Sequence, residues 1–301
     1  MKKPKKESQK CLFCTNNLSI KKGIRKNKNR TIQKYQCKAC KKYFTLQNNN
    51  QISKTYNLSK ILNTISNYNL GTSLRDNQNK IPKSTIHNWI KELKTDLPFN
   101  RLRTRIENIP KHNIIIKKRF IHHNQPFLYQ YHNIKLNFAG KYKGLTKYLK
   151  HLYLPKNIFN KSERISKLSK IYLNKKLSEK QNYAVKLAKL ALSITKDNKK
   201  RHNIIENFML INDTATIAVE IPIYLYPNET NINKALTGHI DILQIRYNDI
   251  YILDYKPEPI NKSQAINQLL TYKEALSRRT KIKKQNIKLA FFNNKAYYEF
   301  S

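Results

Sequence analysis

Acidic residues are scarce in this 301-residue chain. Asp and Glu together number 18 against 60 Lys and Arg, which gives a formal net charge of +42. Binding a polyanion relieves the self-repulsion of such a charge, so the composition indicates a nucleic-acid partner, with an anionic membrane as the second candidate. Residues 201–301 carry 13 basic and 10 acidic residues, so nearly all of the excess lies in the first 200 residues.

Long apolar runs are also missing from the sequence, although 39% of its residues are hydrophobic. A spanning helix needs a run of roughly 20 apolar residues, and a secretory signal needs a shorter one near the start. We therefore expect a cytoplasmic, nucleoid-associated protein with no membrane partner. The length suffices for two or three small domains. The oligomeric state stays open, with a homodimer as one option.

Cysteine is rare, and its four occurrences all fall before residue 41. Cys11 and Cys14 form one C-x-x-C pair, and Cys37 and Cys40 form a second one. Disulfides are disfavoured in a reducing cytoplasm, and two such pairs at this separation are typical of a structural zinc site. A redox pair or an accidental spacing is the alternative. The tail CKACKKYFT resembles the zinc ribbon of transposases, so we predict a zinc ribbon over residues 1–48, whose folding depends on Zn²⁺.

Residues 52–97 show helical periodicity. Apolar residues recur at helical spacing in TYNLSKILNTISNYNLG, and TSLRDNQNKI is predicted as a second, short helix. In the third, STIHNWIKEL, Ser84 is the expected N-cap. The expected buried residues of the first and third helices are Leu58, Ile61, Leu62, Ile65, Tyr68, Ile86, Trp89, Ile90 and Leu93.

Three short helices with a glycine turn indicate a helix-turn-helix. The last helix of that fold enters the major groove of DNA, and its early residues meet base edges. Ser84, Thr85, His87 and Asn88 are therefore the candidate DNA-binding residues. A plain helical bundle with a solvated basic face is the alternative. The segment YNLGTSLRDNQNKIPKSTIHNWIKE resembles the helix-turn-helix of transposases, which favours DNA binding.

Residues 98–180 carry weaker signals, and we expect a basic helical connector that faces the substrate. His122, His123 and His132 lack neighbouring cysteines and have few acidic neighbours, so exposed or packing roles are favoured over metal binding. The interleaved Lys and Tyr residues of KYKGLTKYLKHLYLPK have two interpretations. They stack on bases or line a phosphate channel, or they belong to an amphipathic helix with tyrosines on one face.

Residues 181–301 hold most of the carboxylates. The pattern reads helix, three strands, helix, strand, which predicts an α/β core. Asp241 lies in the second strand, and Asp254 and Lys256 lie in and after the third. If these strands are neighbours, both carboxylates meet at one edge and repel each other unless a cation intervenes. Oxygen ligands suit Mg²⁺ or Mn²⁺, which activates water and neutralises phosphate charge.

The sequences GHID and ILDYKP resemble the PD-(D/E)XK nuclease superfamily, its RecB-like branch especially. The resemblance implies a restriction-endonuclease-like core in which Asp241, Asp254 and Lys256 form the catalytic set. It also implies a helical acid or histidine at the metal. Glu206 is our choice and His202 the competitor. Further members implied by the resemblance are Glu220 as an additional acid, which is a ligand or a catalytic group, and Gln268 with Tyr272 on the following helix.

The whole sequence is thus interpreted as a multi-domain, metal-dependent DNA endonuclease that hydrolyses phosphodiester bonds. A zinc ribbon and a three-helix helix-turn-helix would target a nuclease core at residues 181–301. The main alternative is a non-catalytic DNA-binding regulator or transposition accessory protein with an inactive nuclease fold. A transposase is a third candidate, but it would need a widely spaced acidic triad on an RNase H-like fold.

Overall fold

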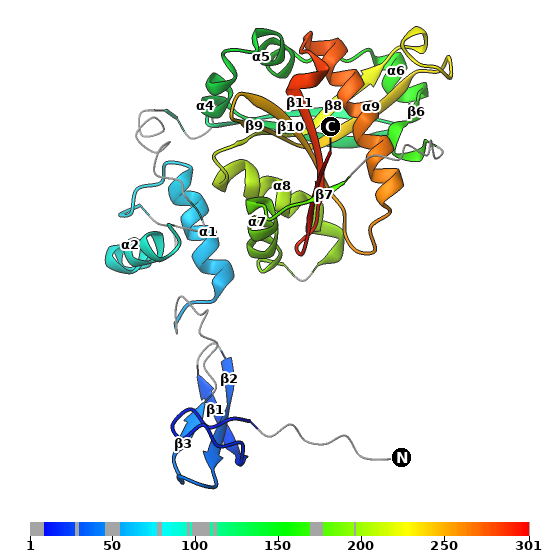
Figure 1. The fold of residues 1–301 in the computed structure, drawn as a ribbon. Coiled ribbons are helices and arrows are strands. Elements are labelled where there is room, and N and C mark those ends of the chain that lie inside the picture. Colours follow the sequence, from blue (N-terminus) through cyan, green and yellow to red (C-terminus); the bar gives the residue numbers. More distant parts are fainter. Residues whose placement is uncertain are drawn as a thin grey trace, which may run out of the picture. The chain divides into compact units, whose positions relative to one another are not determined.

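The computed structural model describes residues 9–27, 30–45, 55–76, 80–94, 97, 109–110, 113–168, 177–195 and 197–300. It divides into two compact units, Met1–Ile61 and Leu62–Ser301 (Figure 1). Helix α1 (Leu58–Asn69) contains the boundary between them.

The first unit contains a three-stranded antiparallel sheet. Its strands are β1 (Ser19–Asn27), β2 (Arg30–Cys37) and β3 (Tyr43–Thr45), in that order. The buried residues of this unit around the sheet are Cys11, Cys37 and Phe44, with Tyr35 packed against them. Two of these three residues are cysteines, so the thiols themselves supply much of the core.

The predicted helices at either end of residues 55–94 are present, as α1 and α2 (Lys83–Glu92). Their apolar faces are buried as expected, at Ile61, Leu62, Ile65, Ile86, Trp89 and Leu93. The predicted N-cap is wrong. Pro82 caps α2, its carbonyl oxygen accepts a hydrogen bond from the Ile86 amide at 3.2 Å, and Ser84 is already inside the helix.

The short helix predicted between them is wrong over the described residues. Thr72–Asp76 and Lys80–Ile81 form bends and irregular chain, with Lys80 in the left-handed region at a φ of 49°. The Ser73 hydroxyl accepts hydrogen bonds from the amides of Arg75 and Asp76 and donates one to the Asp76 carboxylate at 2.6 Å. Such local side-chain bonds give the backbone an alternative to helical bonding.

The second unit is built on a nine-stranded sheet, in the order β4-β5-β8-β9-β10-β11-β12-β7, with β6 also paired to β9. Strands β10 and β11 are parallel, as are β6 and β9, and the other pairs are antiparallel. The strands are β4 (Ile115–His122), β5 (Gln125–His132), β6 (Glu163–Arg164), β7 (Ser178–Glu179), β8 (Thr216–Leu225), β9 (Leu236–Arg246), β10 (Asp249–Tyr255), β11 (Ile287–Phe292) and β12 (Tyr297–Phe300).

The expected helical connector needs correction, because β4 and β5 form a hairpin that extends this sheet through β8. One side of the hairpin is buried, with Tyr129 and Tyr131 in the main hydrophobic core. Burial of these aromatic side chains accounts for a strand pair where the local charge pattern indicated an exposed connector.

Helices cover both faces of the sheet (Figure 1). Helices α7 (Tyr183–Leu192) and α8 (Arg201–Asn212) pack on one face, and α5 (Lys143–Lys150) and α9 (Lys262–Thr280) pack together on the other. The remaining helices are short: α4 (Asn133–Leu136), α6 (Lys156–Lys161) and the 3₁₀ turns Asn137–Ala139, Ile165–Lys167, Asn198–Lys200, Pro227–Glu229 and Lys284–Asn286.

The predicted order of the C-terminal elements is confirmed as α8-β8-β9-β10-α9-β11. Parallel strands need a crossover between them, and α9 provides it for β10 and β11. The first helical segment of this region consists of two helices, since α7 ends at Leu192 and α8 begins at Arg201. These elements bring the C-terminal end of β10 beside β9 and under the first half of α9.

Candidate metal centres

The four cysteines converge in the first unit. Their sulfur atoms all lie within 4.8 Å of one another, with Sγ to Sγ distances of 3.7 Å for Cys11–Cys40 and 3.5 Å for Cys14–Cys37. Tetrahedral zinc with bonds of about 2.3 Å places its sulfur ligands roughly 3.7 Å apart. Burial raises the pKa of the Cys11 thiol, but amide donors from Cys14 and Phe13 outweigh it and lower the pKa to about 6. The cluster could therefore hold a zinc ion.

A second cluster forms where β9 and β10 meet. The antiparallel register pairs Leu253 with Ile242, so the next positions on the two strands are Asp254 and Asp241. The Asp241 carboxylate accepts a hydrogen bond from the Tyr255 amide at 3.2 Å, and Lys256 Nζ lies 2.8 Å from Asp254 Oδ2. The structure thus brings together the two aspartates and the lysine predicted from the sequence.

Helix α8 adds two further groups to this cluster. His202 and Glu206 lie one helical turn apart, and His202 Nδ1 is 3.6 Å from Asp241 Oδ2. Ligand atoms of His202, Glu206 and Asp241 all lie within 4.8 Å of one another. The sequence left open whether Glu206 or His202 belongs to the metal site. Both side chains reach Asp241, so both are candidate ligands.

Glu220, on β8, brings a further carboxylate to this cluster. It is the one half-buried residue in a strand whose other described positions are buried, and its φ of 53° lies in the left-handed region. Its carboxylate raises the pKa of Glu206, which shows that the two carboxylates are near neighbours. His239 Nδ1 lies 3.2 Å from Glu220 Oε2.

Burial shifts the pKa of these carboxylates unequally. It raises the pKa of Glu206 and of Asp254 well above the usual range, and neighbouring carboxylates raise both further. Burial also acts to raise the pKa of Asp241, but His202 and Lys256 outweigh it and hold the pKa at about 2. Glu206 and Asp254 therefore ionise together with Asp241 only when additional positive charge is nearby.

Four buried carboxylate oxygens of the cluster have no hydrogen bond among the described residues: Glu206 Oε1, Glu220 Oε2, Asp254 Oδ1 and Asp254 Oδ2, the last of which lies 2.8 Å from Lys256 Nζ. A buried charged oxygen without a partner is costly, and a bound cation removes that cost. Carboxylate oxygens are the ligands that Mg²⁺ and Mn²⁺ prefer, and a histidine nitrogen is compatible with Mn²⁺. The residues present fit such an ion.

Helix α9 holds the lysine in place. Lys256 Nζ donates to Gln268 Oε1 at 3.0 Å, and the Gln268 amide donates to the Tyr272 hydroxyl at 2.9 Å. Gly238 lies against the same tyrosine, and a Cβ at Gly238 would stand 2.7 Å from Tyr272 Cε1. The glycine of GHID is thus required by a ring packed on β9.

Two histidines near the cluster, His122 and His239, make a contact that the sequence did not predict. His122 is 1% exposed, and its ring nitrogens lie 2.7 Å from His239 Nε2 and 2.7 Å from Thr237 Oγ1. The alternation of Thr237, His239 and Asp241 along β9 was a usable signal, because residues two apart share a face of a strand. His132 is a packing residue as expected, buried and accepting a hydrogen bond from the Lys135 amide.

The DNA-binding candidates lie together on α2. Ser84, His87 and Asn88 are exposed, whereas Thr85 is half-buried. Accessible side chains are necessary for base contacts, but their role stays a prediction.

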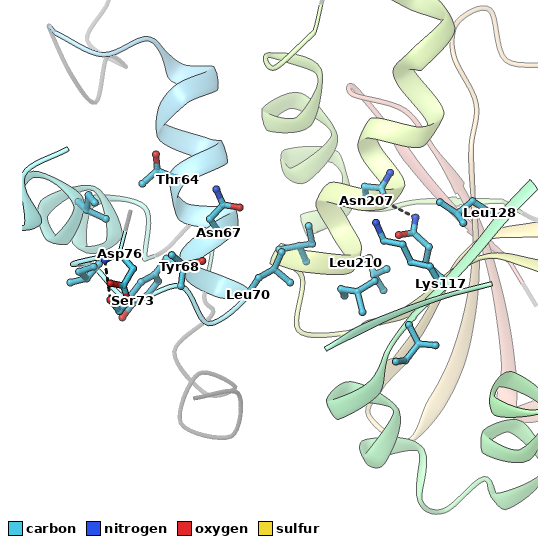
Figure 2. Close-up of a pocket in the computed structure, with 17 residues that line it drawn as sticks. Thr64, Asn67, Tyr68, Leu70, Ser73, Asp76, Lys117, Leu128, Asn207 and Leu210 are labelled. Carbon is cyan, nitrogen blue, oxygen red and sulfur yellow. Dashed lines mark hydrogen bonds between the residues drawn. The ribbon is translucent and has the colours of Figure 1, made fainter. Parts of the chain in front are cut away.

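The second unit also contains a cavity of about 980 Å³ (Figure 2). Residues of α1, of the turn at Ser73–Asp76, of the β4–β5 hairpin and of α8 line it, including Asn67, Lys117 and Asn207. None of the carboxylates of the β8–β10 cluster is among its lining residues. The cavity is therefore separate from the candidate metal centre.

The fold and the cluster together define a class of site: buried carboxylates and a lysine on and beside neighbouring strands, suited to holding a divalent cation. Comparisons with protein-family models, curated proteins and solved structures find no match to the chain. No helix in the part of the chain that the structure describes is long and apolar enough to cross a membrane.

Proposed function

We propose that this protein is a divalent-metal-dependent DNA endonuclease with a PD-(D/E)XK-type, restriction-endonuclease-like core. The observation that carries the proposal is the convergence of Asp241, Asp254 and Lys256 with Glu206 on an α-β-β-β-α-β order of elements. The pairing of β9 with β10 brings Asp241 beside Asp254 and Lys256, and helix α8 adds Glu206 from a more distant part of the chain.

The residues of the cluster suit phosphodiester hydrolysis. Asp241, Asp254, Glu206 and His202 would hold the metal, with Glu220 as a further ligand or a base. A bound Mg²⁺ or Mn²⁺ would acidify a water and neutralise charge on the scissile phosphate. Lys256, fixed by Asp254 and Gln268, would orient the attacking water and stabilise the charge that develops on the phosphate oxygens.

The basic N-terminal part would bring this core to DNA. The zinc ribbon and α2 offer Lys-rich surfaces that contact phosphates, and Ser84, Thr85, His87 and Asn88 would meet base edges. Binding should weaken steeply with salt, because each phosphate contact releases counterions. A cytoplasmic, nucleoid-associated location and, as one option, a homodimer belong to this proposal.

The rival is a DNA-binding regulator or transposition accessory protein with an inactive nuclease fold. A domain that has lost catalysis has no need to retain both aspartates, the lysine and the glutamine that holds it. Here Lys256 lies at ion-pair distance from Asp254 and donates a hydrogen bond to Gln268. The register of β9 and β10 places Asp241 beside Asp254, and Asp241 accepts a hydrogen bond from the Tyr255 amide. A transposase is less well supported, since the acids gather on adjacent strands near the C-terminus.

The test compares wild type with Lys256→Ala on plasmid, single-stranded and branched DNA in Mg²⁺. We expect cleavage by wild type and a loss of roughly 100-fold or more in the variant, the usual effect of removing a charge-stabilising group. Lys262→Ala, an exposed lysine at the start of α9, is the matched control and should cleave normally. Wild type that binds DNA but leaves every substrate intact would establish the non-catalytic rival.

A further inference from the structure

We propose that His239 and His122 form a relay of side chains that positions the Glu220 carboxylate, and that the two histidines are positioning residues of the candidate metal centre. The inference rests on the proposed function for the role of Glu220. It assigns a positioning role to two side chains that the nuclease signature does not include.

The relay runs outward from the cluster. Glu220 Oε2 lies 3.2 Å from His239 Nδ1, and His239 Nε2 lies 2.7 Å from His122 Nδ1. His122 Nε2 lies 2.7 Å from Thr237 Oγ1, which is 2.5 Å from Ser162 Oγ. Five side chains from β4, β8, β9 and the end of α6 are thus connected in one row.

The chemistry of each group gives the hydrogen bonds a direction that serves the carboxylate. A carboxylate only accepts, so His239 donates to it from Nδ1. With His239 Nε2 as an acceptor, His122 donates to it from Nδ1, and His122 Nε2 accepts from the Thr237 hydroxyl. Thr237 Oγ1 in turn accepts from Ser162. Each ring nitrogen has a partner in this arrangement.

The surroundings keep the relay in this form. Burial and the nearby His239, His123 and Arg164 lower the pKa of His122 to about 3, so the ring is neutral near pH 7. Aromatic rings hold the imidazoles from the side, with ring centroids 4.0 Å apart for Phe127–His239 and 5.4 Å apart for His122–Phe159. Rotation of either imidazole out of the row would disturb this packing.

Glu220 is the member that needs such support. Its φ of 53° lies in the left-handed region, which is unfavourable for a residue with a Cβ, so the surrounding fold must maintain it. Its Oε2 atom is buried and has no hydrogen bond of regular geometry among the described residues, which leaves His239 Nδ1, at 3.2 Å, as a donor within reach. A donor there fixes one carboxylate oxygen and leaves the other for the cluster.

The first test is spectroscopic and needs neither metal at the cluster nor catalysis. In ¹⁵N-histidine NMR of the zinc-loaded, magnesium-free full chain, we expect a proton on Nδ1 of both His239 and His122. An Nε2–H tautomer at His239 would present a bare nitrogen to Glu220 and would overturn the relay, whether or not the protein proves to be a nuclease.

The second test uses two variants of His239, each of which reproduces the position of only one of its two ring nitrogens. In His239→Asn the amide replaces Nδ1 beside Glu220, and in His239→Gln it replaces Nε2 beside His122. We expect Mn²⁺ affinity, measured by electron paramagnetic resonance, within about threefold of wild type for the asparagine variant. For the glutamine variant we expect a 10- to 100-fold loss, as for other groups that orient metal ligands.

His132→Gln is the packing control, because His132 is also fully buried but lies outside the relay. It should lower the melting temperature without changing Mn²⁺ affinity. Equal Mn²⁺ affinities for the two His239 variants would contradict the relay. So would a control variant that weakens Mn²⁺ as much as His239→Gln does. Wild-type protein that lacks Mn²⁺ affinity, with the expected tautomers present, would count against the proposed function instead.

Discussion

Asp241 and Asp254 stand opposite each other on neighbouring strands, yet their pKa values shift in opposite directions. Burial raises the pKa of Asp254, and the charge of Asp241 raises it further. His202 and Lys256 overcome the effect of burial at Asp241 and lower its pKa to about 2. One aspartate is thus ready to attract a cation, while its neighbour gains charge as the cation arrives. The same residue type serves two purposes because the contacts differ.

The glycine of GHID offers a test of how the lysine is held. Gly238→Ala would place a methyl group 2.7 Å from the Tyr272 ring, which must move and carry Gln268 away from Lys256. We expect a loss of about 1–3 kcal/mol in the free energy of unfolding, measured by urea denaturation, together with reduced cleavage.

Gly140→Ala is the matched control for that substitution. A Cβ at Gly140 meets only the Asn137 carbonyl oxygen, at 3.4 Å, and its φ of −51° suits any residue. Its stability should stay within about 0.5 kcal/mol of wild type. If Gly238→Ala is equally harmless, the ring of Tyr272 does not depend on a glycine, and the proposed support of Lys256 by α9 is wrong.

At the scale of elements, the sequence predicts the C-terminal half well and the middle poorly. Strands such as TIAVEIPIYL are mostly apolar because both faces are covered, so they stand out from the polar turns between them. The helix predicted at TSLRDNQNKI fails because the Ser73 side chain bonds the local backbone. The β4–β5 hairpin joins the sheet through pairing with β8, a contact between residues far apart in sequence.

The candidate site was only partly predictable, because some of its contacts join residues that are far apart in sequence. Asp241, Asp254 and Lys256 follow from strand pairing between near neighbours in the chain. His202 and Glu206 both reach Asp241 since they lie four residues apart on α8, a spacing that sequence alone could have shown. His122 could not be predicted, because the fold carries it from β4 to a residue of β9 that is 117 positions away.

Helix α5 bears on the two interpretations of KYKGLTKYLKHLYLPK. Tyr142 and Tyr148 are buried and donate hydrogen bonds to the carbonyls of Asn248 and Pro222, so these two rings do not stack on bases, whereas Tyr153 is exposed. The helix itself is amphipathic. Lys143, Lys147 and Lys150 line a shallow hollow of about 400 Å³ together with Gly140, Thr146 and His151. Three cations without a carboxylate in the hollow suit the phosphates of a nucleic-acid backbone.

The prediction for this element is a change in the salt dependence of DNA binding. Replacing Lys143, Lys147 and Lys150 by Gln should lower the slope of log affinity against log salt by about 2 to 3, because three phosphate contacts are lost. Fluorescence anisotropy of a labelled duplex at several salt concentrations measures it.

The control removes the same charge from lysines that already have partners. Lys180, Lys234 and Lys295 each lie 2.6 Å from a glutamate. Their replacement by Gln should change the slope by less than half as much. Equal slopes for the two triple variants would show that α5 contributes only its net charge and is not a DNA contact.

At the scale of the whole molecule, the two parts of the chain differ in their charge and in what stabilises their fold. The 100 or so C-terminal residues are nearly neutral and hold the candidate catalytic cluster, whereas the remaining sequence carries most of the +42 charge. The Leu62–Ser301 unit has an extended hydrophobic core, but the small core of the Met1–Ile61 unit includes two of its four cysteines. Zinc should therefore be a condition for folding in the first unit alone.

Cys37→Ser tests this division. Cys37 is fully buried in the cysteine cluster, so its loss should reduce the zinc content from one ion per chain to almost none and unfold the first unit. The second unit should keep its melting transition and its Mn²⁺ affinity, while DNA affinity falls because the ribbon no longer presents its lysines as a surface. Lys38→Gln, at the neighbouring exposed position, should retain zinc and a folded ribbon.

A zinc-free Cys37→Ser protein whose ribbon residues still resist proteolysis would show that the sheet folds without metal. Loss of the second transition as well would show that the two units depend on each other for stability.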